Sequence, residues 1–467
     1  MSGYHKKPSL LGRQPLLRVG FSYHYNQPNW GGLRCDCKTP IPKALPTGEG
    51  WVGLNRHFSV KNLDKTAPSM SILPQKQASP HKQFGVLRIT TVQESLESLL
   101  KGQMRFFVEQ GYQVSMASAV TKPEQLANLE AHEGCKHYEL PLTRQITPIK
   151  DLLAIWKTYR LIRNLRPNIV HTHTPKAGMV GMIAAWFARV PIRLHTVAGL
   201  PLMERTGFTK QILIAVERMT YRFATEVFPN SFGLQNYIFQ HISSSTKIKV
   251  IGQGSSNGIN IHYFSKTEVI EQQARLLREE LGLSPQAFVW IFVGRMVKDK
   301  GINELIAAFL DFEQQYPNQK LLLVGPYEQA LDPLLPQTIS AITAHSNIFH
   351  VGFQKDIRPY LAVADALVFP SYREGFPNVP MQAACMGLPL ILSDINGCNE
   401  LIINNQSGLL IPPKSSDAIF EAMQRLYLSA ELRLSLAREG QRDIQEKYSQ
   451  IVVWHKIKAA YDALLRQ

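Results

Sequence analysis

Residues Ser371 to Glu400 read SYREGFPNVPMQAACMGLPLILSDINGCNE, and this stretch carries the pattern that decides the fold. The apolar run before it, Ala366 to Phe369, predicts a buried parallel strand. A helix is expected to run through Met386, where the Gly-Leu-Pro that follows stops it. A second apolar strand, Leu390 to Ser393, comes next. Strand, loop, helix and strand in this order indicate an α/β sheet.

One acid and one amide of this stretch are expected to face the same crevice. Glu374 lies just past the end of the first strand, where open α/β sheets bind their ligands. Gly375 allows close approach to a ligand, and Pro377 and Pro380 suit a loop and the first helical turn. Gln382 lies in the helix. The alternative is a solvated Glu on an ordinary loop, which further motifs upstream disfavour.

The loop GRMVKDKG, Gly294 to Gly301, supplies the matching cations. It follows the apolar strand Ala287 to Val293 and precedes a helix, so Arg295 and Lys300 flank a helix N-terminus. Such a terminus favours negative charge and offers unpaired N–H groups. Arg295 can grip two oxygens of a phosphate, while Lys300 acts as a point charge. A β–α loop with solvated cations is the alternative, and Glu374 downstream favours a phosphate site.

These motifs together resemble the family 4 retaining glycosyltransferases, in particular the capsule, exopolysaccharide and lipid-linked oligosaccharide branch. The family usually has a second Glu where this chain has Gln382. The resemblance implies that Glu374 contacts the donor sugar, that Gln382 holds the ribose, and that Arg295 and Lys300 bind the diphosphate. Glu374, Arg295 and Lys300 are therefore the expected catalytic residues. The expected nucleotide-sugar contacts are Gly294, Gly375, Phe376, Pro377, Asn378, Val379 and Gln382.

The whole chain of 467 residues divides into four predicted parts. Residues 1–80 are broken by prolines and have no sustained periodicity, which predicts a basic, disordered extension. Residues 81–268 and 269–450 each alternate strand and helix, and 451–467 is a last helix expected to pack across the domain junction. The resemblance starts near Gly85 and implies a GT-B fold, with two Rossmann-like parallel-sheet domains facing across a cleft. Within it, Leu96 to Gln110 is expected to form one helix and Lys247 to Gly254 a strand.

The positive charge of the chain is concentrated before the second domain. Residues 1–80 carry 11 Lys and Arg against 3 Asp and Glu, residues 81–280 carry 24 against 15, and residues 281–467 carry 16 against 18. A one-sided positive field attracts anionic lipid, phosphorylated acceptors or nucleic acid. Nucleic acid is disfavoured because no helix-turn-helix, zinc finger or RNA-binding signature is present. A basic surface that only aids solubility is the alternative.

The acceptor side is expected in the first parallel-sheet domain. His171 and His173 point to one face of a strand, and His173 and Lys176 lie toward its carboxyl end. The further candidates on this side are His195, Gly199 and Asn230. The sequence does not decide whether His171, His173 or His195 is catalytic or structural. Many family members have a His before the glycine that matches Gly199, whereas this chain has Ala198, which questions a family-style catalytic His.

Several classes are disfavoured by what the sequence lacks. It contains no Asp-any-Asp pair, the motif with which metal-dependent glycosyltransferases of the other major fold hold a divalent cation, so no metal is expected. No other cofactor is expected either. It has no run of 18 apolar residues and no leader of basic and then apolar residues, so no membrane span or secretion is expected. The five cysteines are scattered, which suits a reducing compartment. A cytoplasmic enzyme, peripheral at the inner face of the cell membrane, is the expectation.

These observations predict a metal-independent, retaining glycosyltransferase. It would move a hexose or N-acetylhexosamine from a UDP-sugar to a polyprenyl-diphosphate-linked or other glycan. The departing diphosphate oxygen would take the proton of the acceptor hydroxyl. Two alternatives stay open: a non-hydrolysing nucleotide-sugar epimerase, and a catalytically silent nucleotide-sugar-binding partner subunit, which Ala198 and Gln382 motivate.

Overall fold

The computed structural model describes residues 83–467 except 146, 205 and 329–331. The predicted extension, residues 1–80, lies outside these described residues. Two parallel sheets organise the described chain, and each has six strands. Within the described residues, no helix is both long and apolar enough to cross a membrane.

The first sheet has the strand order β3-β2-β1-β4-β5-β6. Its strands are β1 (Gly85–Val92), β2 (Gln113–Ala119), β3 (Lys136–Glu139), β4 (Ile169–His173), β5 (Ile192–Val197) and β6 (Glu226–Pro229). Its helices are α1 (Gln93–Leu99), α2 (Gln103–Glu109), α3 (Pro123–Glu133), α4 (Pro148–Leu165), α5 (Pro175–Phe187), η1 (Pro201–Glu204), α6 (Gly207–Phe223) and α7 (Phe232–His241).

The second sheet has the order β12-β11-β10-β7-β8-β9, which is the same connectivity read from the other edge. Its strands are β7 (Phe288–Val293), β8 (Gln319–Val324), β9 (Ile348–His350), β10 (Ala366–Phe369), β11 (Leu390–Ser393) and β12 (Leu409–Ile411). Its helices are α8 (Glu268–Glu280), η2 (Lys298–Lys300), α9 (Ile302–Gln315), α10 (Pro336–Ala344), α11 (Arg358–Val363), α12 (Asn378–Cys385), α13 (Ser416–Leu428) and α14 (Ala430–Tyr448). Two doubly wound parallel sheets confirm the predicted fold class.

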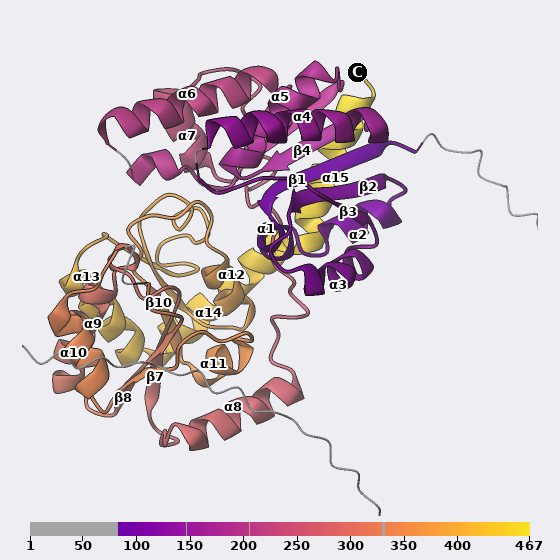
Figure 1. Cartoon of the computed structure of the whole chain (residues 1–467). Coiled ribbons are helices and arrows are strands. Elements are labelled where there is room, and N and C mark those ends of the chain that lie inside the picture. Colours follow the sequence, from indigo (N-terminus) through magenta and orange to yellow (C-terminus); the bar gives the residue numbers. More distant parts are fainter. Residues whose placement is uncertain (1–82, 146, 205, 329–331) are drawn as a thin grey trace, which may run out of the picture. The chain divides into compact units, whose positions relative to one another are not determined.

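Helices cover both faces of the first sheet (Figure 1). Alternate residues of β1 point to opposite faces: Leu87 packs in a core with residues of α4, α5 and α6, whereas Val86 packs in a core with residues of α2. The chain's last helix, α15 (Gln450–Leu465), joins the second of these cores through Ile457 and Tyr461. The C-terminal helix, drawn in yellow, therefore completes the first domain although the second domain precedes it in the sequence (Figure 1).

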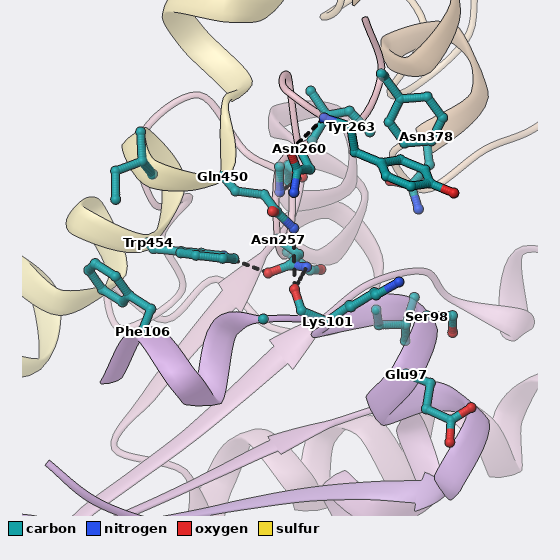
Figure 2. Close-up of a pocket in the computed structure, with 18 of the residues that line it drawn as sticks. Glu97, Ser98, Lys101, Phe106, Asn257, Asn260, Tyr263, Asn378, Gln450 and Trp454 are labelled. Atoms are coloured by element: carbon teal, nitrogen blue, oxygen red, sulfur yellow. Dashed lines mark hydrogen bonds between the residues drawn. The ribbon is translucent and has the colours of Figure 1, made fainter. Parts of the chain in front are cut away.

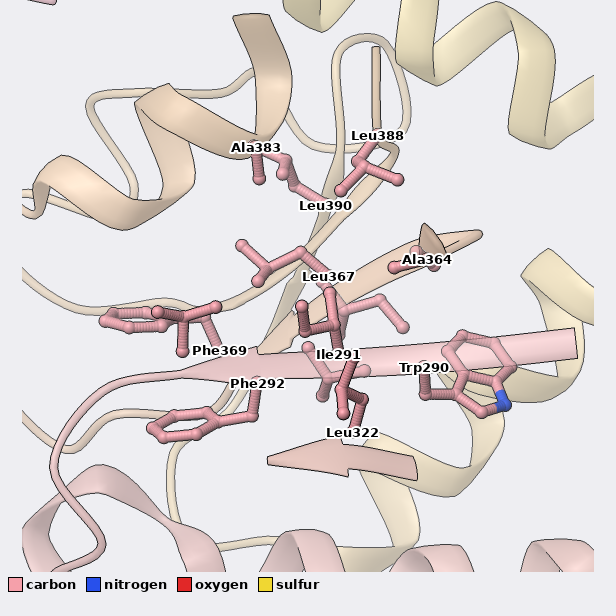
Figure 3. Packing of buried hydrophobic residues seen from close by; sticks show 14 of the residues in the cluster. Trp290, Ile291, Phe292, Leu322, Ala364, Leu367, Phe369, Ala383, Leu388 and Leu390 are labelled. Atoms are coloured by element: carbon pink, nitrogen blue, oxygen red, sulfur yellow. The ribbon is translucent and has the colours of Figure 1, made fainter. Parts of the chain in front are cut away.

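The strands of the second sheet are apolar throughout because both of their faces are covered. All six residues of β7 are buried. Phe292 of β7 stacks on Phe369 of β10 at a centroid distance of 5.9 Å (Figure 3). The buried indole N–H of Trp290 donates to Gln319 at 2.9 Å, so its polar atom is not left without a partner. Continuous apolar strands of this kind are typical of parallel sheets.

Two predicted elements are wrong in detail. The single helix expected from Leu96 to Gln110 is two helices, α1 and α2, because Gly102 adopts a left-handed φ of 80° between them. The strand expected from Lys247 to Gly254 is reduced to one isolated bridge between Ile248 and β6. Gly252 and Gly254 have φ values of 62° and 95°, which end the extended conformation.

Candidate functional site

The motifs singled out in the sequence meet where the strand order of the second sheet reverses. β7 and β10 are neighbours in that sheet although β8 and β9 lie between them in the chain. Arg295 follows the end of β7, and Glu374 follows the end of β10. Crevices at such a switch point are where open α/β sheets bind ligands. The fold therefore brings two distant loops to the same edge of the sheet.

Lys300 and Glu374 form a charged pair across these two loops. The Lys300 ammonium lies 2.5 Å from a Glu374 carboxylate oxygen, and about one seventh of each side chain is exposed, 14% and 15%. The same ammonium lies 5.8 Å from the ring centre of Phe369 at the end of β10. Both groups are mostly buried and tightly paired, so their positions at the edge of the sheet are fixed.

Arg295 is the more accessible cation of the site. Its guanidinium pairs with Glu328 at 2.7 Å, and 40% of its side chain is exposed. Burial raises the pKa of Asp299 against the attraction of Lys300 and Arg295, which both lie near enough to act on it. Both cations, with Glu374, thus act electrostatically on the Asp299 carboxylate.

Asp299 also fastens the two loops to each other, a role that the sequence did not reveal. Its carboxylate pairs with Arg373, and its backbone carbonyl accepts the N–H of Tyr372 at 2.8 Å. The Tyr372 hydroxyl donates to Glu304 of α9 at 2.6 Å. The loop after β10 is therefore bound along its length to the loop after β7. In the sequence, Asp299 is recognisable as an acid between Lys298 and Lys300. Its pairing with Arg373, however, depends on the adjacency of β7 and β10 in the sheet.

Two glycines permit the close packing of these loops. Gly301 has a left-handed φ of 71°, and a Cβ there would lie 2.2 Å from the carbonyl oxygen of Pro370. A Cβ on Gly375 would lie 2.1 Å from the carbonyl oxygen of Ala198, in the loop after β5. Larger residues at either position would force the backbones apart. Gly375 thus places the Glu374 loop directly against the first parallel-sheet domain.

A cavity of about 720 Å³ adjoins this contact, and residues from both sheet domains line it. Phe376, Asn378 and Gln382, three of the predicted nucleotide-sugar contacts, are among its lining residues. The second domain adds Lys355. Pro377 is the N-cap residue of α12, and Val379 packs partly against the core, so these two position the loop and the helix. A volume of this size accommodates a small-molecule ligand.

One wall of the cavity is built around Asn257, in the segment between the two domains (Figure 2). Its side-chain oxygen accepts from the Trp454 indole of α15 at 2.6 Å and from Gln103 of α2 at 2.9 Å. Its side-chain NH₂ donates to the carbonyl of Lys101 at 3.1 Å. Figure 2 shows Lys101 beside this junction, with Ser98 on the same side of the cavity. The sequence analysis did not anticipate this wall, since its residues come from three separate segments of the chain.

Asn230 is the acceptor-side candidate that the structure places at the cavity. Its side-chain NH₂ donates to the carbonyl of Ala198 at 3.2 Å. Its side-chain oxygen is buried and has no protein partner within the described residues. Gly199 lies beside the Gly375 contact, since its Cα is 3.4 Å from where a Gly375 Cβ would be. These residues form the first-domain side of the same crevice.

The expectation that His173, His195 and Lys176 reach the cleft is not supported by their environment. His173 and His195 are 2% and 1% exposed, and neither lines the cavity. His173 accepts from Arg88 at 3.1 Å, and His195 lies 2.9 Å from the Thr172 hydroxyl. Burial lowers the pKa of both, to about 4 for His195. The Lys176 ammonium pairs with Asp151 at 2.6 Å and its side chain is 9% exposed.

A second pair of residues missed by the sequence analysis joins the two domains. Glu400, in the segment after β11, accepts from the backbone N–H groups of Phe232 and Gly233 at 2.7 and 2.8 Å. These are the first two residues of α7. Asn396 donates to the carbonyl of Glu374 at 2.9 Å and lies 3.1 Å from the Ser231 hydroxyl. A carboxylate at a helix N-terminus is favourable, so this contact holds the Glu374 loop beside the first domain.

Comparisons with known proteins agree with this geometry. The family described as glycosyl transferases group 1 matches residues 273–443, and a glycosyl transferase 4-like domain matches residues 97–254. The chain is 30% identical over 385 residues to the capsular polysaccharide biosynthesis glycosyltransferase CapM of Staphylococcus aureus. That alignment covers 82% of this chain and 98% of CapM.

Another curated relative has a more specific description. An Escherichia coli UDP-Gal:α-D-GlcNAc-diphosphoundecaprenol α-1,3-galactosyltransferase is 30% identical over 294 residues, which cover 61% of this chain and 73% of that enzyme. Among solved structures, Anabaena HepE in complex with UDP and glucose superposes with a TM-score of 0.67 at 19% identity. It covers 82% of this chain and 100% of the HepE chain, which confirms the shared fold.

Proposed function

This chain belongs to the group 1 glycosyltransferases, and we propose that it transfers a sugar from a UDP-sugar to a lipid-linked glycan with retention of anomeric configuration. The observation that carries the proposal is the pairing of Lys300 with Glu374 at the switch point of the second sheet. Relatives described as capsular and diphosphoundecaprenol-linked glycosyltransferases support the class of acceptor, a polyprenyl-diphosphate-linked glycan.

The site residues divide the work of binding the donor. Arg295 and Lys300 receive the diphosphate, and Glu374 contacts the hydroxyls of the transferred sugar. Gln382, which lines the cavity, hydrogen-bonds the ribose as a neutral partner. Glu374 and Glu328 pair with the two cations in the described structure, so an arriving diphosphate shares or displaces these carboxylates.

The reaction follows from where charge develops. The bond between the sugar's anomeric carbon and the diphosphate oxygen breaks, and the acceptor oxygen bonds to the same face of that carbon. The proton of the acceptor hydroxyl passes to the departing diphosphate oxygen, so the products are the new glycoside and UDP. Arg295 and Lys300 stabilise the negative charge that grows on the diphosphate, the kind of preorganised stabilisation worth the most in enzymes. This route needs no protein base. It is therefore compatible with His173 and His195 being buried and neutral, away from the cavity.

We further propose that the protein works without a divalent metal or other cofactor, at the inner face of the cell membrane. The two cations fill the role that a metal ion would have on the diphosphate. Activity should therefore persist in a chelator and should not rise when magnesium or manganese is added back. Activity that is lost in the chelator and restored by either ion contradicts this part.

The direct test is UDP or GDP release from a panel of nucleotide sugars with polyprenyl-diphosphate-linked acceptors. We expect release that depends on both a UDP-sugar and an acceptor, and an NMR spectrum of the product that shows the donor's anomeric configuration. An inverted product contradicts the retaining mechanism.

A catalytically silent nucleotide-sugar-binding subunit is the second candidate, because Ala198 and Gln382 both line the cavity and both depart from the usual pattern. Binding of UDP-sugars without turnover for any acceptor would favour it.

A further inference from the structure

The first turns of helix α4 have an unusual distribution of side chains. The residues buried in these turns are Asp151, Ala154 and Thr158, which are polar or small, and the first large apolar residue that α4 buries is Ile162, in its second half. The helix exposes large apolar side chains in its first turns: Ile149 is 85% exposed, Leu152 69%, Leu153 47% and Trp156 52%. A surface helix of a globular protein normally turns its large apolar residues inward. Four such residues within eight positions of one helix make a contiguous exposed face, which marks an interaction site.

The charges on this helix have one sign. Lys150, Lys157, Arg160 and Arg163 are exposed, and the Arg160 guanidinium lies 4.9 Å from the ring centre of Trp156. The acid of the helix, Asp151, is buried and paired with Lys176. The exposed surface of α4 therefore combines apolar groups with cations and presents no carboxylate of that helix. An amphipathic face of this composition is typical of helices that lie in the interface of an anionic membrane.

The position of this face relates it to the cavity. α4 ends shortly before β4 begins, so the first turn of α4 lies at the carboxyl edge of the first sheet. α6, which follows β5, also begins at that edge, and its Phe208 is 81% exposed. α4, α5 and α6 cover the same face of the sheet (Figure 1). The carboxyl edge also carries Ala198 and Asn230 of the cavity.

We propose that the exposed face of α4, formed by Ile149, Leu152, Leu153 and Trp156 with the flanking cations, docks the protein on an anionic lipid bilayer. The apolar side chains enter the boundary between headgroups and acyl chains, while the cations meet lipid phosphates. A lipid-linked acceptor held in that bilayer would then reach the crevice from the carboxyl edge of the first sheet. This last step rests on the proposed function, whereas the docking itself does not.

Vesicle sedimentation of the full chain tests the docking. We compare phosphatidylcholine vesicles with vesicles that also contain phosphatidylglycerol, and the wild type with Leu152→Ser/Trp156→Ser and Lys157→Glu/Arg160→Glu. Removing one cation near an anionic surface costs roughly fivefold in partitioning, so the charge reversals should lower binding by at least tenfold. The apolar pair should lower it by a similar factor. The matched controls are Leu428→Ser/Leu434→Ser and Arg275→Glu/Arg438→Glu, which alter exposed residues of the second domain and should bind as the wild type does.

Brominated acyl chains give a direct readout of insertion. They should quench part of the tryptophan fluorescence of the wild type, and Trp156→Phe should lose that part because it keeps the apolar face but removes the reporter. UDP binding of each variant, measured by calorimetry, should equal that of the wild type and shows that the fold is intact.

Three results would overturn the inference: equal binding of all variants, equal binding to both kinds of vesicle, or quenching that Trp156→Phe leaves unchanged. A concentration-dependent dimer that Leu152→Ser/Trp156→Ser dissociates would show instead that a second copy covers this face. Failure of the transferase proposal would leave these binding results unaffected, so the two outcomes are distinguishable.

Discussion

The two sheets of this protein share one strand order, but the residues at their switch points have opposite characters. In the second sheet, Arg295, Lys300 and Glu374 are charged and partly exposed. In the first sheet, β1 and β4 meet at the corresponding place. Within these two strands, before their carboxyl ends, the side chain of Arg88 is completely buried and lies 2.5 Å from His171.

The buried cluster around Arg88 connects the first sheet to the C-terminal helix; this cluster is called the hub below. Arg88 donates to Tyr461 of α15 at 2.8 Å, and His171 and His173 stack with ring centres 4.3 Å apart. Burial lowers the pKa values of Arg88, His171 and His173. The hub therefore ties the C-terminal helix to the first sheet and keeps its histidines neutral. One topology thus holds partly exposed charged groups in one domain and a buried anchoring cluster in the other.

The largest effect is expected at the second switch point. Lys300→Ala should lower turnover about 10²-fold or more, the usual cost of one preorganised electrostatic group, and Arg295→Ala should do likewise. Glu374→Gln should lower turnover far more than UDP affinity, because the proposed function assigns this carboxylate to the transferred sugar, where charge develops. Steady-state kinetics and calorimetric UDP binding measure both quantities. If Glu374→Gln turns over every competent donor at the wild-type rate, the catalytic assignment fails.

The buried histidines of the first sheet should make the stability of the protein depend on pH. The folded-state pKa of His195 is about 4, and those of His171 and His173 also lie below the ordinary value near 6.5. As pH falls below about 6.5, the unfolded chain takes up protons that the folded chain does not. Stability should therefore decline as pH falls from 7 to 5, and each such histidine should contribute to the slope.

Urea unfolding at several pH values between 7 and 5 measures this slope. His195→Gln removes one titrating group from the buried set, so its slope should be smaller than that of the wild type. The exposed His262→Gln is the matched control and should keep the wild-type slope. Equal slopes in all three proteins would contradict the assignment of His195 as buried and neutral.

The sequence predicted the second switch point well because its residues are close in the chain to strands with strong apolar runs. Glu374 and Lys300 each follow such a strand by a few residues, so sheet topology alone brings them together. The expectation that His173 and His195 lie at the cleft was not supported. Alternation along a strand shows which face of the sheet a side chain points to, but it does not show which residues cover that face. Tyr461 and Arg88 are 373 residues apart, and no local pattern indicates that pairing. The contacts of Glu400 and Asn257 link distant segments in the same way.

The Glu400 contact gives a prediction of intermediate size. Glu400→Ala removes the acceptor of two N–H groups at the start of α7, and charge-assisted bonds of this kind contribute about 1.5–3 kcal/mol. Hydrogen exchange at Phe232 and Gly233 should therefore accelerate by roughly tenfold or more, as measured by mass spectrometry of a peptide that spans both residues. Glu400→Gln keeps an acceptor and should show a smaller increase. Unchanged exchange in Glu400→Ala would mean that water replaces the carboxylate at no cost.

The smallest effects are expected at Gln382, and their pattern separates nucleoside binding from sugar chemistry. Gln382→Ala should weaken UDP binding by about 1–2 kcal/mol, because the proposed function makes Gln382 the partner of the ribose hydroxyls. Gln382→Glu should be tolerated or should tighten UDP modestly, since a charged acceptor forms the stronger bond. Both variants should keep a kcat near that of the wild type with saturating donor, in contrast to Glu374→Gln. Calorimetry with UDP and with the free sugar measures the difference. If Gln382→Ala lowers kcat as strongly as Glu374→Gln and leaves UDP affinity unchanged, then Gln382 acts on the transferred sugar and the division of roles between these two residues is wrong.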